Sequence, residues 1–499
     1  MGRVLERRRR RREARRGVRR GVRRGVRIGA PDRSLTRFSG LAAVSELVER
    51  LDVIGRLDAA IGPIKTRDRG ASGGEVLVGM AAAQLAGEDF LVGLDRHRAD
   101  TAGQALTPVP GLASTTAAGL ARRFCDGQWV AVETGLGDVH AAALDALAVV
   151  APERAKVLTA SVTIDLDTTD VEVYGRLKRG VAFNHQGQRV GRPHVAAWAE
   201  TSTVLAADLG SGRDDPRANA AELLNRALAA LPAPARGGEV RLRADAGYFA
   251  GQLARAALFA GVGFAIGARR IAPLWRLLDS VPADGWTDAI GMTGAQVAVT
   301  EYCPDWWPAK TRLLIRRVQL NLDHGQVSGD PRARRRRTLH PDQRALPLAE
   351  LADADAVYAY SFIVTDLDVS TGDRAVEVEH WYRHRTQIEN LFRDSKLGAA
   401  LRHLPSGYPQ VNRAWMWGGL LAATLCGWLH HLTATHRDGQ LIGHGIRGGH
   451  AMIATLRHRL IAVPARLVHH AGRLTLRLPP GEDLLAHVLA RIRALPEPT

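Results

Sequence analysis

Apolar residues in the first third of the chain follow the period of an α-helix. Between residues 39 and 147 they recur at intervals of three and four positions, as at Leu41, Val44 and Leu47. This spacing places them on one side of a helix, and that side can pack into a core. The pattern predicts a helical N-terminal domain over residues 36–150.

One short helix of this domain carries basic residues at its end. Ser114, Thr115 and Thr116 are suitable N-cap residues, and the helix that they would start ends at Arg122 and Arg123. A short basic helix can enter a groove of DNA. A solvated basic face explains the same residues equally well, and both interpretations stay open.

After Pro152 the pattern changes to the alternation of a β-strand. Residues 157–167 alternate apolar and polar side chains, and further strand-like and helical segments follow. Strands that alternate with helices predict an α/β fold with a mixed sheet. The further strands are expected at 194–199, 203–209, 239–244 and 262–266, and the helices at 219–231 and 249–259.

Residues 268–375 interrupt this alternation with β-rich sequence, including strands near 312–320 and 357–364. Regular structure resumes with a helix expected at 376–397. The predicted organisation is a disordered basic arm at 1–35, a helical DNA-binding domain at 36–150, a core formed by 151–267 and 376–430, a β-rich insertion at 268–375, and a C-terminal region at 431–499.

The charge of the chain favours a polyanionic partner such as nucleic acid. The net charge is +17 and the pI is about 10.7. Of this charge, +12 lies in residues 1–30, where RRGV occurs three times, so the rest of the chain is only mildly basic. A run of like charges cannot collapse, and we expect it to be disordered. Either the run is an arm that contacts DNA phosphates, or translation begins downstream of it.

The remaining composition points to a cytoplasmic protein without a membrane span. The three cysteines have no spacing typical of a disulfide framework or a zinc site. No apolar segment follows the basic run, so no signal peptide is expected. The apolar stretch 414–429 is shorter than the roughly 20 residues that span a bilayer and contains three glycines. It predicts a buried helix.

Three aspartates stand on strands of the predicted core. Asp165 and Asp167 lie two apart and project from the same face of a strand, and Asp245 follows the strand 239–244 directly. A carboxylate among apolar residues is costly unless it is paired or bound to a metal ion. Hard oxygen ligands suit Mg²⁺ or Mn²⁺, and two such ions can assist phosphodiester chemistry.

The helix predicted at 376–397 carries a fourth carboxylate in a polar stripe. At about 100° per residue, Tyr382, Arg385, Glu389 and Lys396 fall within about 60° of one another. Cations beside a carboxylate suit a metal-bound phosphodiester, because they hold phosphate oxygens while the carboxylate holds the ion. Taken alone, such a stripe is more often a solvated face.

These motifs resemble a known family of enzymes. The stripe matches the Y-x2-R-x3-E-x6-K signature of DDE transposases from bacterial insertion sequences, and IDLDTTDVEVYG and RADAGYF resemble the two aspartate motifs of the branch called transposase DDE domain group 1. GEDFLVGLDRHRAD and LASTTAAGLARRF are also similar to that branch. The resemblance covers about residues 36–480, and its specificity comes from three motifs in the right order.

The resemblance implies a ribonuclease H-like core with a β-rich insertion before the catalytic glutamate. It assigns Asp167, Asp245 and Glu389 to a catalytic triad that holds Mg²⁺ or Mn²⁺, as two ions. Water would attack at the end of the element, and the freed 3′ hydroxyl would then attack target DNA. The same resemblance assigns the grip on transposon-end phosphates to Tyr382, Arg385 and Lys396.

Two assignments are less settled. Asp167 is preferred over Asp165 as the first catalytic aspartate because it stands in an Asp-x-Thr pattern, and Asp165 is kept as a further metal ligand. Trp306 and Trp307 lie in the insertion, where relatives use an aromatic residue, so Trp306 is a candidate to stack on a flipped base. Core packing or a turn is the more common role for such a pair beside prolines.

The resulting hypothesis is a cut-and-paste transposase that binds the terminal inverted repeats of an insertion sequence. Its partners would be double-stranded DNA and a second copy of the chain, because two ends must be brought together. Two alternatives stay open. One is a catalytically inactive DNA-binding protein derived from a transposase, and the other is a metal-dependent nuclease of the same fold.

Overall fold

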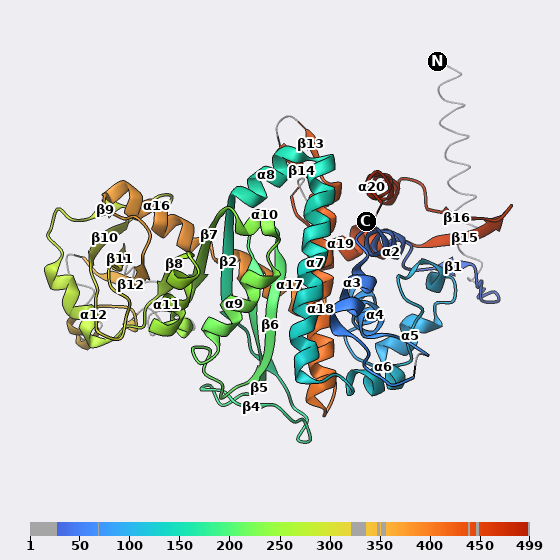
Figure 1. Ribbon diagram of the computed structural model, residues 1–499, viewed down its shortest axis with the longest axis horizontal. Helices are drawn as coiled ribbons and strands as arrows, with labels where there is room; N and C mark the ends of the chain where they lie inside the picture. Colours follow the sequence, from blue (N-terminus) through green and yellow to red (C-terminus); the bar gives the residue numbers. More distant parts are fainter. Residues whose placement is uncertain are drawn as a thin grey trace, which may run out of the picture.

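The computed structural model describes residues 27–67, 69–320, 336–346, 350, 356–437, 440–445 and 449–497. Most of the predicted basic arm therefore lies outside the described residues. The molecule is elongated, with the N-terminal helices at one end, a set of strands at the other, and a sheet and two long helices between them (Figure 1).

The N-terminal part is helical, as the apolar spacing predicted. A capping box begins one of its helices, where the Ser72 hydroxyl accepts from the Glu75 amide at 3.1 Å and the Glu75 carboxylate accepts from the Ser72 amide at 2.8 Å. The elements are α2 (Leu41–Arg50), α3 (Val53–Ile61), α4 (Gly73–Leu85), α5 (Gly93–Ala99), η1 (Gly103–Leu106), α6 (Ser114–Ala121) and α7 (Asp126–Val150).

The predicted N-cap of the short basic helix is wrong. Helix α6 begins at Ser114 itself, its N-cap position is Ala113, and no side chain caps it there. Ser114 instead binds the carboxylate of Asp95, with its hydroxyl at 2.5 Å and its amide at 2.9 Å. The Ser114 hydroxyl, which the local sequence predicted to cap the helix, therefore forms a tertiary contact instead.

The central sheet is mixed, as expected, and extends further than expected. Strands β2, β7 and β8 are parallel neighbours, and the other pairs are antiparallel. Among the described residues the order is β3-β5-β2-β7-β8-β12-β11-β10-β9, with β4 and β6 also paired to β5. The bounds are β2 (Ser161–Thr168), β3 (Val171–Glu172), β4 (Ala182–Phe183), β5 (Arg189–Trp198), β6 (Thr203–Ser211), β7 (Glu239–Ala244), β8 (Gly263–Gly267), β9 (Thr287–Asp288), β10 (Ala295–Glu301), β11 (Arg312–Gln319) and β12 (Tyr358–Thr365).

Two expectations about these strands change. Residues 157–160 belong to helix α8 (Pro152–Ala160), so the first strand begins only at Ser161. The β-rich segment continues the main sheet, because β12 pairs with β8 through Ile363 and Gly267. The pairing of β12 with β8 depends on backbone hydrogen bonds between distant segments of the chain. The local spacing of apolar residues does not predict such bonds. The segment also holds α12 (Ala272–Arg276), η3 (Leu277–Ser280) and α14 (Pro341–Ala345).

The helix expected at 376–397 is divided in two. Helix α16 (Gly372–Arg383) ends with short-range bonds from the amides of His384 to Trp381 and of Arg385 to Tyr382, both at 3.2 Å, and α17 (Thr386–Gly398) follows. Arg385 stands at the break, where its side chain reaches across to the sheet. The other helices of this part are α9 (Ala220–Ala230), α10 (Ala233–Arg236), η2 (Ala246–Tyr248) and α11 (Gly251–Phe259).

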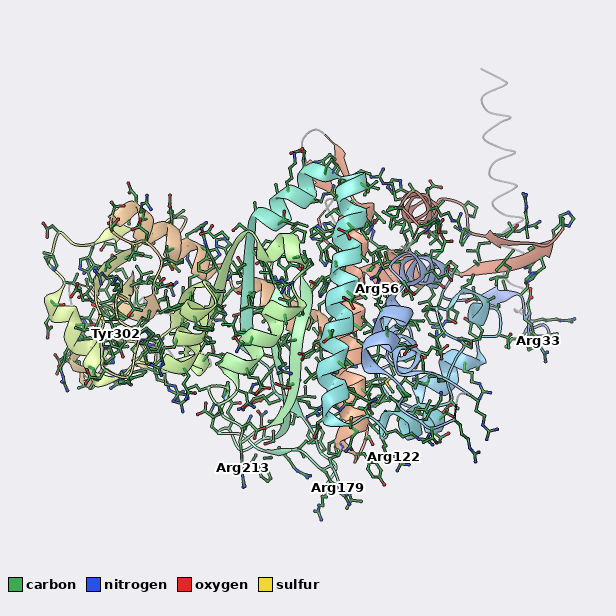
Figure 2. The ribbon with its side chains drawn as sticks, viewed as in Figure 1. Arg33, Arg56, Arg122, Arg179, Arg213 and Tyr302 are labelled. Atoms are coloured by element: carbon green, nitrogen blue, oxygen red, sulfur yellow. The ribbon has the colours of Figure 1, made fainter. Side chains whose placement is uncertain are left out.

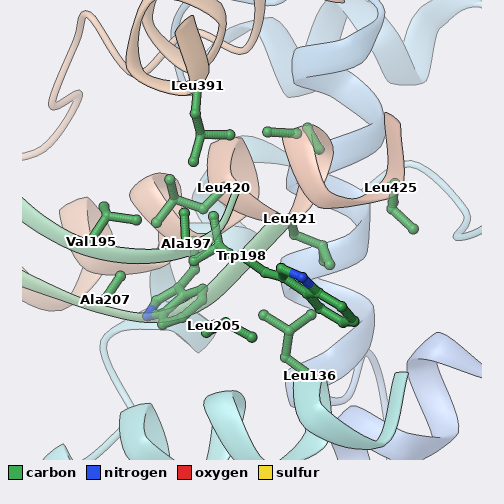
Figure 3. Packing of buried hydrophobic residues seen from close by; sticks show 14 of the residues in the cluster. Leu136, Val195, Ala197, Trp198, Leu205, Ala207, Leu391, Leu420, Leu421 and Leu425 are labelled. Atoms are coloured by element: carbon green, nitrogen blue, oxygen red, sulfur yellow. The ribbon is translucent and has the colours of Figure 1, made fainter. Parts of the chain in front are cut away.

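Helix α18 (Pro409–Thr433) forms the centre of the core. Its residues 414–429 are all buried, as predicted, and it packs beside α7 and against β5 and β6 (Figures 1 and 3). Trp428 meets the ring of Trp198 edge-on, with centroids 6.1 Å apart. Burial of each large apolar side chain here contributes about 1.5–3 kcal/mol. In the described part of the chain, no helix combines the length and apolar character needed to cross a bilayer.

The C-terminal segment returns to the N-terminal helices. Strand β15 pairs with β1 near the start of the described chain, and Arg493 of the last helix forms an ion pair with Glu46 of α2. The two ends of the described chain therefore lie side by side (Figure 1). The elements are β1 (Leu35–Thr36), β13 (Thr435–Arg437), β14 (Gln440–Ile442), α19 (Ile453–Leu456), the π-helical turn η5 (Arg457–Ile461), β15 (Ala465–His470), β16 (Arg473–Arg477) and α20 (Leu484–Arg493).

Candidate active site

Two aspartates emerge together from the parallel strands β2 and β7. The register pairs Leu166 with Ala244, so Asp167 and Asp245 stand at the next position of the two strands. Asp245 directly follows β7 and is the N-cap of the short helix η2, where its carboxylate accepts from the amide of Gly247 at 2.8 Å. Neighbouring strands lie about 5 Å apart, so this geometry brings the two carboxylates to one edge of the sheet.

The third carboxylate comes from helix α17. Glu389 lies in the first turn of that helix and is exposed. With Asp167 and Lys396 it lines an open cavity of about 470 Å³. Burial, together with the negative charges of Asp245 and Glu389, raises the pKa of Asp167 to about 6 against the opposing effect of Arg385. Asp167 is therefore close enough to both Asp245 and Glu389 to be repelled by their charges.

An arginine neutralises part of this charge. Nη2 of Arg385 lies 2.8 Å from the Asp167 carboxylate, and both side chains are largely buried. Burial disfavours the charged form of Arg385, but the combined effect of Asp167, Tyr382, Asp245 and Asp165 outweighs burial, so the pKa of Arg385 is raised. The guanidinium thus supplies the positive charge that the carboxylates need in this state.

Tyr382 and Lys396 each donate to a backbone carbonyl near one of the two aspartates. The hydroxyl of Tyr382 donates to the carbonyl of Ala244, the residue before Asp245, at 3.2 Å. The ammonium of Lys396 donates to the carbonyl of Asp170 at 2.7 Å, just beyond the end of β2. Both side chains therefore tie the two helices to the ends of the strands that carry the aspartates.

The sequence model of one protein family, described as transposase DDE domain group 1, matches residues 21–325 and 348–497. The chain belongs to this family. No curated protein matches the chain. Among solved structures, the piggyBac transposase synaptic complex with hairpin DNA, determined by cryo-EM, is 11% identical and aligns over 93% of this chain and 86% of that chain, with a TM-score of 0.37. A TM-score of this size does not establish a shared fold.

A DDE transposase of this family needs carboxylates that can take up divalent metal ions, and this chain offers a suitable set. The three carboxylates supply the hard oxygen donors that Mg²⁺ and Mn²⁺ prefer. Within the residues that the structure describes, no three His, Cys, Asp or Glu side chains are already arranged to hold an ion. In this state one oxygen of the Asp167 carboxylate is paired with Arg385.

Asp165 has a different role from the metal ligand that the sequence suggested. Its side chain is 0% exposed, and its two oxygens accept from Nε and Nη2 of Arg243 at 2.7 and 2.9 Å. The same guanidinium donates to the carbonyl of Trp381 at 2.6 Å and to Gln387 at 3.2 Å. Both oxygens of Asp165 are thus used in a buried pair that joins the sheet to the helix break. Asp167 is the carboxylate that lines the cavity.

Sequence reasoning missed two residues of this candidate site. Arg243 was passed over as part of a strand, although an arginine within an apolar strand is a signal for a buried partner. Tyr248 follows Asp245 by three residues, is 0% exposed, and its hydroxyl has no hydrogen-bond partner among the described residues. Burial raises the pKa of Tyr248, and the charges of Asp167 and Asp245 raise it further. The hydroxyl therefore lies close to the two aspartates.

The other candidate DNA-binding residues differ in their exposure. Arg122 and Arg123 are exposed at the end of α6, and the guanidinium of Arg122 sits 4.8 Å from the ring centre of Tyr408. Trp306 is partly exposed, whereas Trp307 is buried among aromatic side chains that include Phe249. Core packing therefore explains Trp307, and a role in base stacking for Trp306 stays a prediction.

Proposed function

We propose that this transposase cuts DNA at the ends of a mobile element and joins those ends to target DNA. The observation that supports the proposal is that Asp167 lies close to both Asp245 and Glu389, and that Asp167 and Glu389 line an open cavity. Two of them come from adjacent parallel strands and the third from a helix that follows much later in the chain. A solvated polar helix face would not require this convergence.

In the proposed chemistry, Asp167, Asp245 and Glu389 would hold divalent ions, Mg²⁺ or Mn²⁺. Two such ions would polarise the scissile phosphate and stabilise the charge on the attacking and leaving oxygens. A water oxygen attacks phosphorus, the bond to the 3′ oxygen breaks, and a 3′ hydroxyl is released. That hydroxyl then attacks a phosphodiester of target DNA, so one P–O bond forms as another breaks.

The chain's own cations have separate tasks in this proposal. Arg385 would exchange the Asp167 carboxylate for a DNA phosphate when DNA and metal bind, since arginine forms strong charge-assisted bonds with both. Lys396 lines the cavity beside Glu389 and would hold a second phosphate oxygen. Tyr382 is engaged with the Ala244 carbonyl, so its proposed contribution is to position Asp245.

The test uses a plasmid that carries the coding region with its flanking DNA. With Mg²⁺, the wild-type protein is expected to release strands with free 3′ hydroxyl ends. Asp245→Ala and Glu389→Ala are expected to abolish cleavage while binding of DNA persists. The matched control is Glu377→Ala, which removes an exposed glutamate of α16 and is expected to cut normally. Normal cutting by Asp245→Ala would refute the assignment.

The same assay separates the alternatives. A DNA-binding protein derived from a transposase would bind the plasmid and leave it uncut in Mg²⁺ or Mn²⁺. A nuclease would cut it without joining the new 3′ ends to a second DNA. Recovery of joined products is the outcome that we expect. We also propose that two copies of the chain act together in the cytoplasm, because two element ends must react at one place.

A further inference from the structure

A basic loop follows the strand that carries Asp167. This basic loop (residues 173–189) runs from the end of β3 to the start of β5 and contains β4. It carries Arg176, Lys178, Arg179 and Arg189, and no acidic residue occurs between residues 173 and 199. The segment therefore carries a concentrated positive charge in a chain whose body is only mildly basic.

The backbone of the basic loop is held in place from both sides. Arg189 donates to the carbonyls of Gly175 at 2.7 Å and Lys178 at 2.6 Å. The ammonium of Lys178 donates to the carbonyl of Leu404, and the amide of Arg179 donates to Gly407 at 3.2 Å. These bonds hold the backbone of the basic loop in a defined shape.

The tip presents apolar side chains to solvent. Leu177 is 89% exposed and stands between Arg176 and Lys178, and Tyr174 is 84% exposed. A leucine at this position gains none of the stability that burial of its side chain would give. An apolar tip flanked by cations is an arrangement found in proteins that insert a wedge between base pairs while binding the phosphates on either side.

The surface around the basic loop is also basic. Tyr408, which is partly exposed, lies next to the loop's contact at Gly407 and carries Arg122 over its ring. Arg122, Arg179 and Arg213 lie along one edge of the molecule (Figure 2). A duplex that followed this edge would pass the tip of the loop with its phosphates facing arginines.

The root of the basic loop is tied to the proposed active site. The carbonyl of Asp170 accepts from Lys396, and the Asp170 carboxylate accepts from Nε of Arg192 at 2.7 Å and from Asn184 at 2.8 Å. Lys396 lines the cavity that contains Asp167 and Glu389. The tip is therefore separated from the carboxylates only by a short, well-bonded stretch of chain.

We propose that the basic loop is a DNA wedge, in which the exposed Leu177 inserts between base pairs of a duplex held beside the carboxylates. The inference rests on the proposed function for its substrate, DNA. Exposed cations hold the phosphates, and the apolar tip takes the space of a stacked base. Because the basic loop is positively charged, we expect it to bind a polyanion rather than an apolar protein surface.

The experiment measures base unstacking directly. Short duplexes carry 2-aminopurine, whose fluorescence rises when it leaves the stack, and they are compared with duplexes that contain one mismatched pair. The wild-type protein is expected to raise the fluorescence and to bind the mismatched duplex roughly tenfold more tightly, because unstacking a mismatch costs less. Leu177→Ser is expected to lose both effects and to keep its affinity for the perfect duplex within a few-fold.

A control variant and a second variant separate the effect of apolar insertion from the effect of positive charge. Val157→Ser removes another exposed apolar side chain, 71% exposed, from helix α8 at the opposite end of β2, and it is expected to behave as wild type. Arg179→Ala is expected to weaken binding of all duplexes and to reduce the salt dependence by about one phosphate contact.

Several outcomes would overturn the wedge. It is wrong if the wild-type protein saturates the duplex without any rise in fluorescence, or if Leu177→Ser unstacks the base as well as wild type does. Failure to bind any duplex would overturn both the wedge and the proposed function. A fluorescence rise without strand cleavage would leave the wedge in place and contradict the proposed chemistry alone.

Discussion

Arg385 forms an ion pair with Asp167 across the interface between helix and sheet, with Nη2 2.8 Å from the carboxylate. The pair joins the break between α16 and α17 to the end of β2. It also means that one of the three proposed metal ligands is neutralised while no ion is bound. Metal uptake and the position of Arg385 are therefore expected to be coupled.

This coupling predicts an unusual effect of Arg385→Gln. Without the guanidinium, the three carboxylates lose a neighbouring positive charge, so the DNA-free protein is expected to bind Mn²⁺ roughly tenfold more tightly or better. Calorimetric titration measures the affinity for Mn²⁺. The affinity of Arg385→Lys, which keeps the positive charge, should lie between those of the wild-type protein and Arg385→Gln. DNA cleavage by Arg385→Gln is nevertheless expected to fall. Weaker Mn²⁺ binding in that variant would show that Arg385 does not compete with the ion.

Removal of Asp165 is expected to act on stability. Asp165→Ala leaves the buried guanidinium of Arg243 without its partner, which costs about 3–5 kcal/mol. Urea denaturation would measure this loss. The double variant Asp165→Leu/Arg243→Met removes both charges. Its free energy of unfolding is expected to be closer to that of the wild-type protein than the value for Asp165→Ala is. If Asp165→Ala is as stable as wild type, the pair is not a structural one.

Gly267 is expected to tolerate no side chain. A Cβ atom there would lie 2.5 Å from the hydroxyl oxygen of Tyr382 and 2.9 Å from the amide nitrogen of Ala246. Gly267→Ala should therefore displace Tyr382 from Ala244, destabilise the fold by about 1–3 kcal/mol and slow DNA cleavage. The control is Gly119→Ala, inside α6 with nothing within 4 Å of the new atom, which is expected to stabilise the protein by about 0.5–1 kcal/mol. Equal effects of the two substitutions would contradict this packing.

The buried carboxyl group of Asp394 is expected to make the free energy of unfolding depend on pH. Burial raises its pKa to about 7, against the opposing effects of its hydrogen bond from the Ile453 amide and of Arg457. The folded state thus keeps the proton to a higher pH than the unfolded chain does. Its contribution to stability is complete below about pH 4 and is lost as the pH rises towards 7.

Asp394→Asn tests this expectation. The amide oxygen can still accept from Ile453, but the group no longer titrates, so the fall in the free energy of unfolding between about pH 4 and pH 7 should become shallower, by on the order of 4 kcal/mol at most. The free energy of unfolding by urea at several pH values measures it. An unchanged slope would mean that Asp394 titrates normally in the folded protein.

Local pattern was sufficient for much of the fold. Strand β7 begins and ends where alternation placed it, at Glu239 and Ala244, and α18 is buried as its apolar run required. The end of β7 also predicted the position of Asp245, because a carboxylate directly after a strand must lie at the sheet's edge.

Long-range contacts account for what the pattern missed. The partner of Asp165 depends on the register between β2 and β7, which sets Arg243 opposite it. The break at Arg385 interrupts a sequence with continuous helical periodicity. The place of β12 beside β8 comes from strand pairing across about a hundred residues of chain. None of these is encoded within a window of neighbouring residues.

The central claim is that Asp167, Asp245 and Glu389 together hold metal ions beside DNA. The most direct measurement is saturable Mn²⁺ binding, followed by electron paramagnetic resonance in the presence of duplex DNA. The account predicts that Asp245→Asn and Glu389→Gln each lose this binding, while Glu377→Gln on the preceding helix keeps it. Undiminished Mn²⁺ binding by Asp245→Asn and Glu389→Gln would contradict the account.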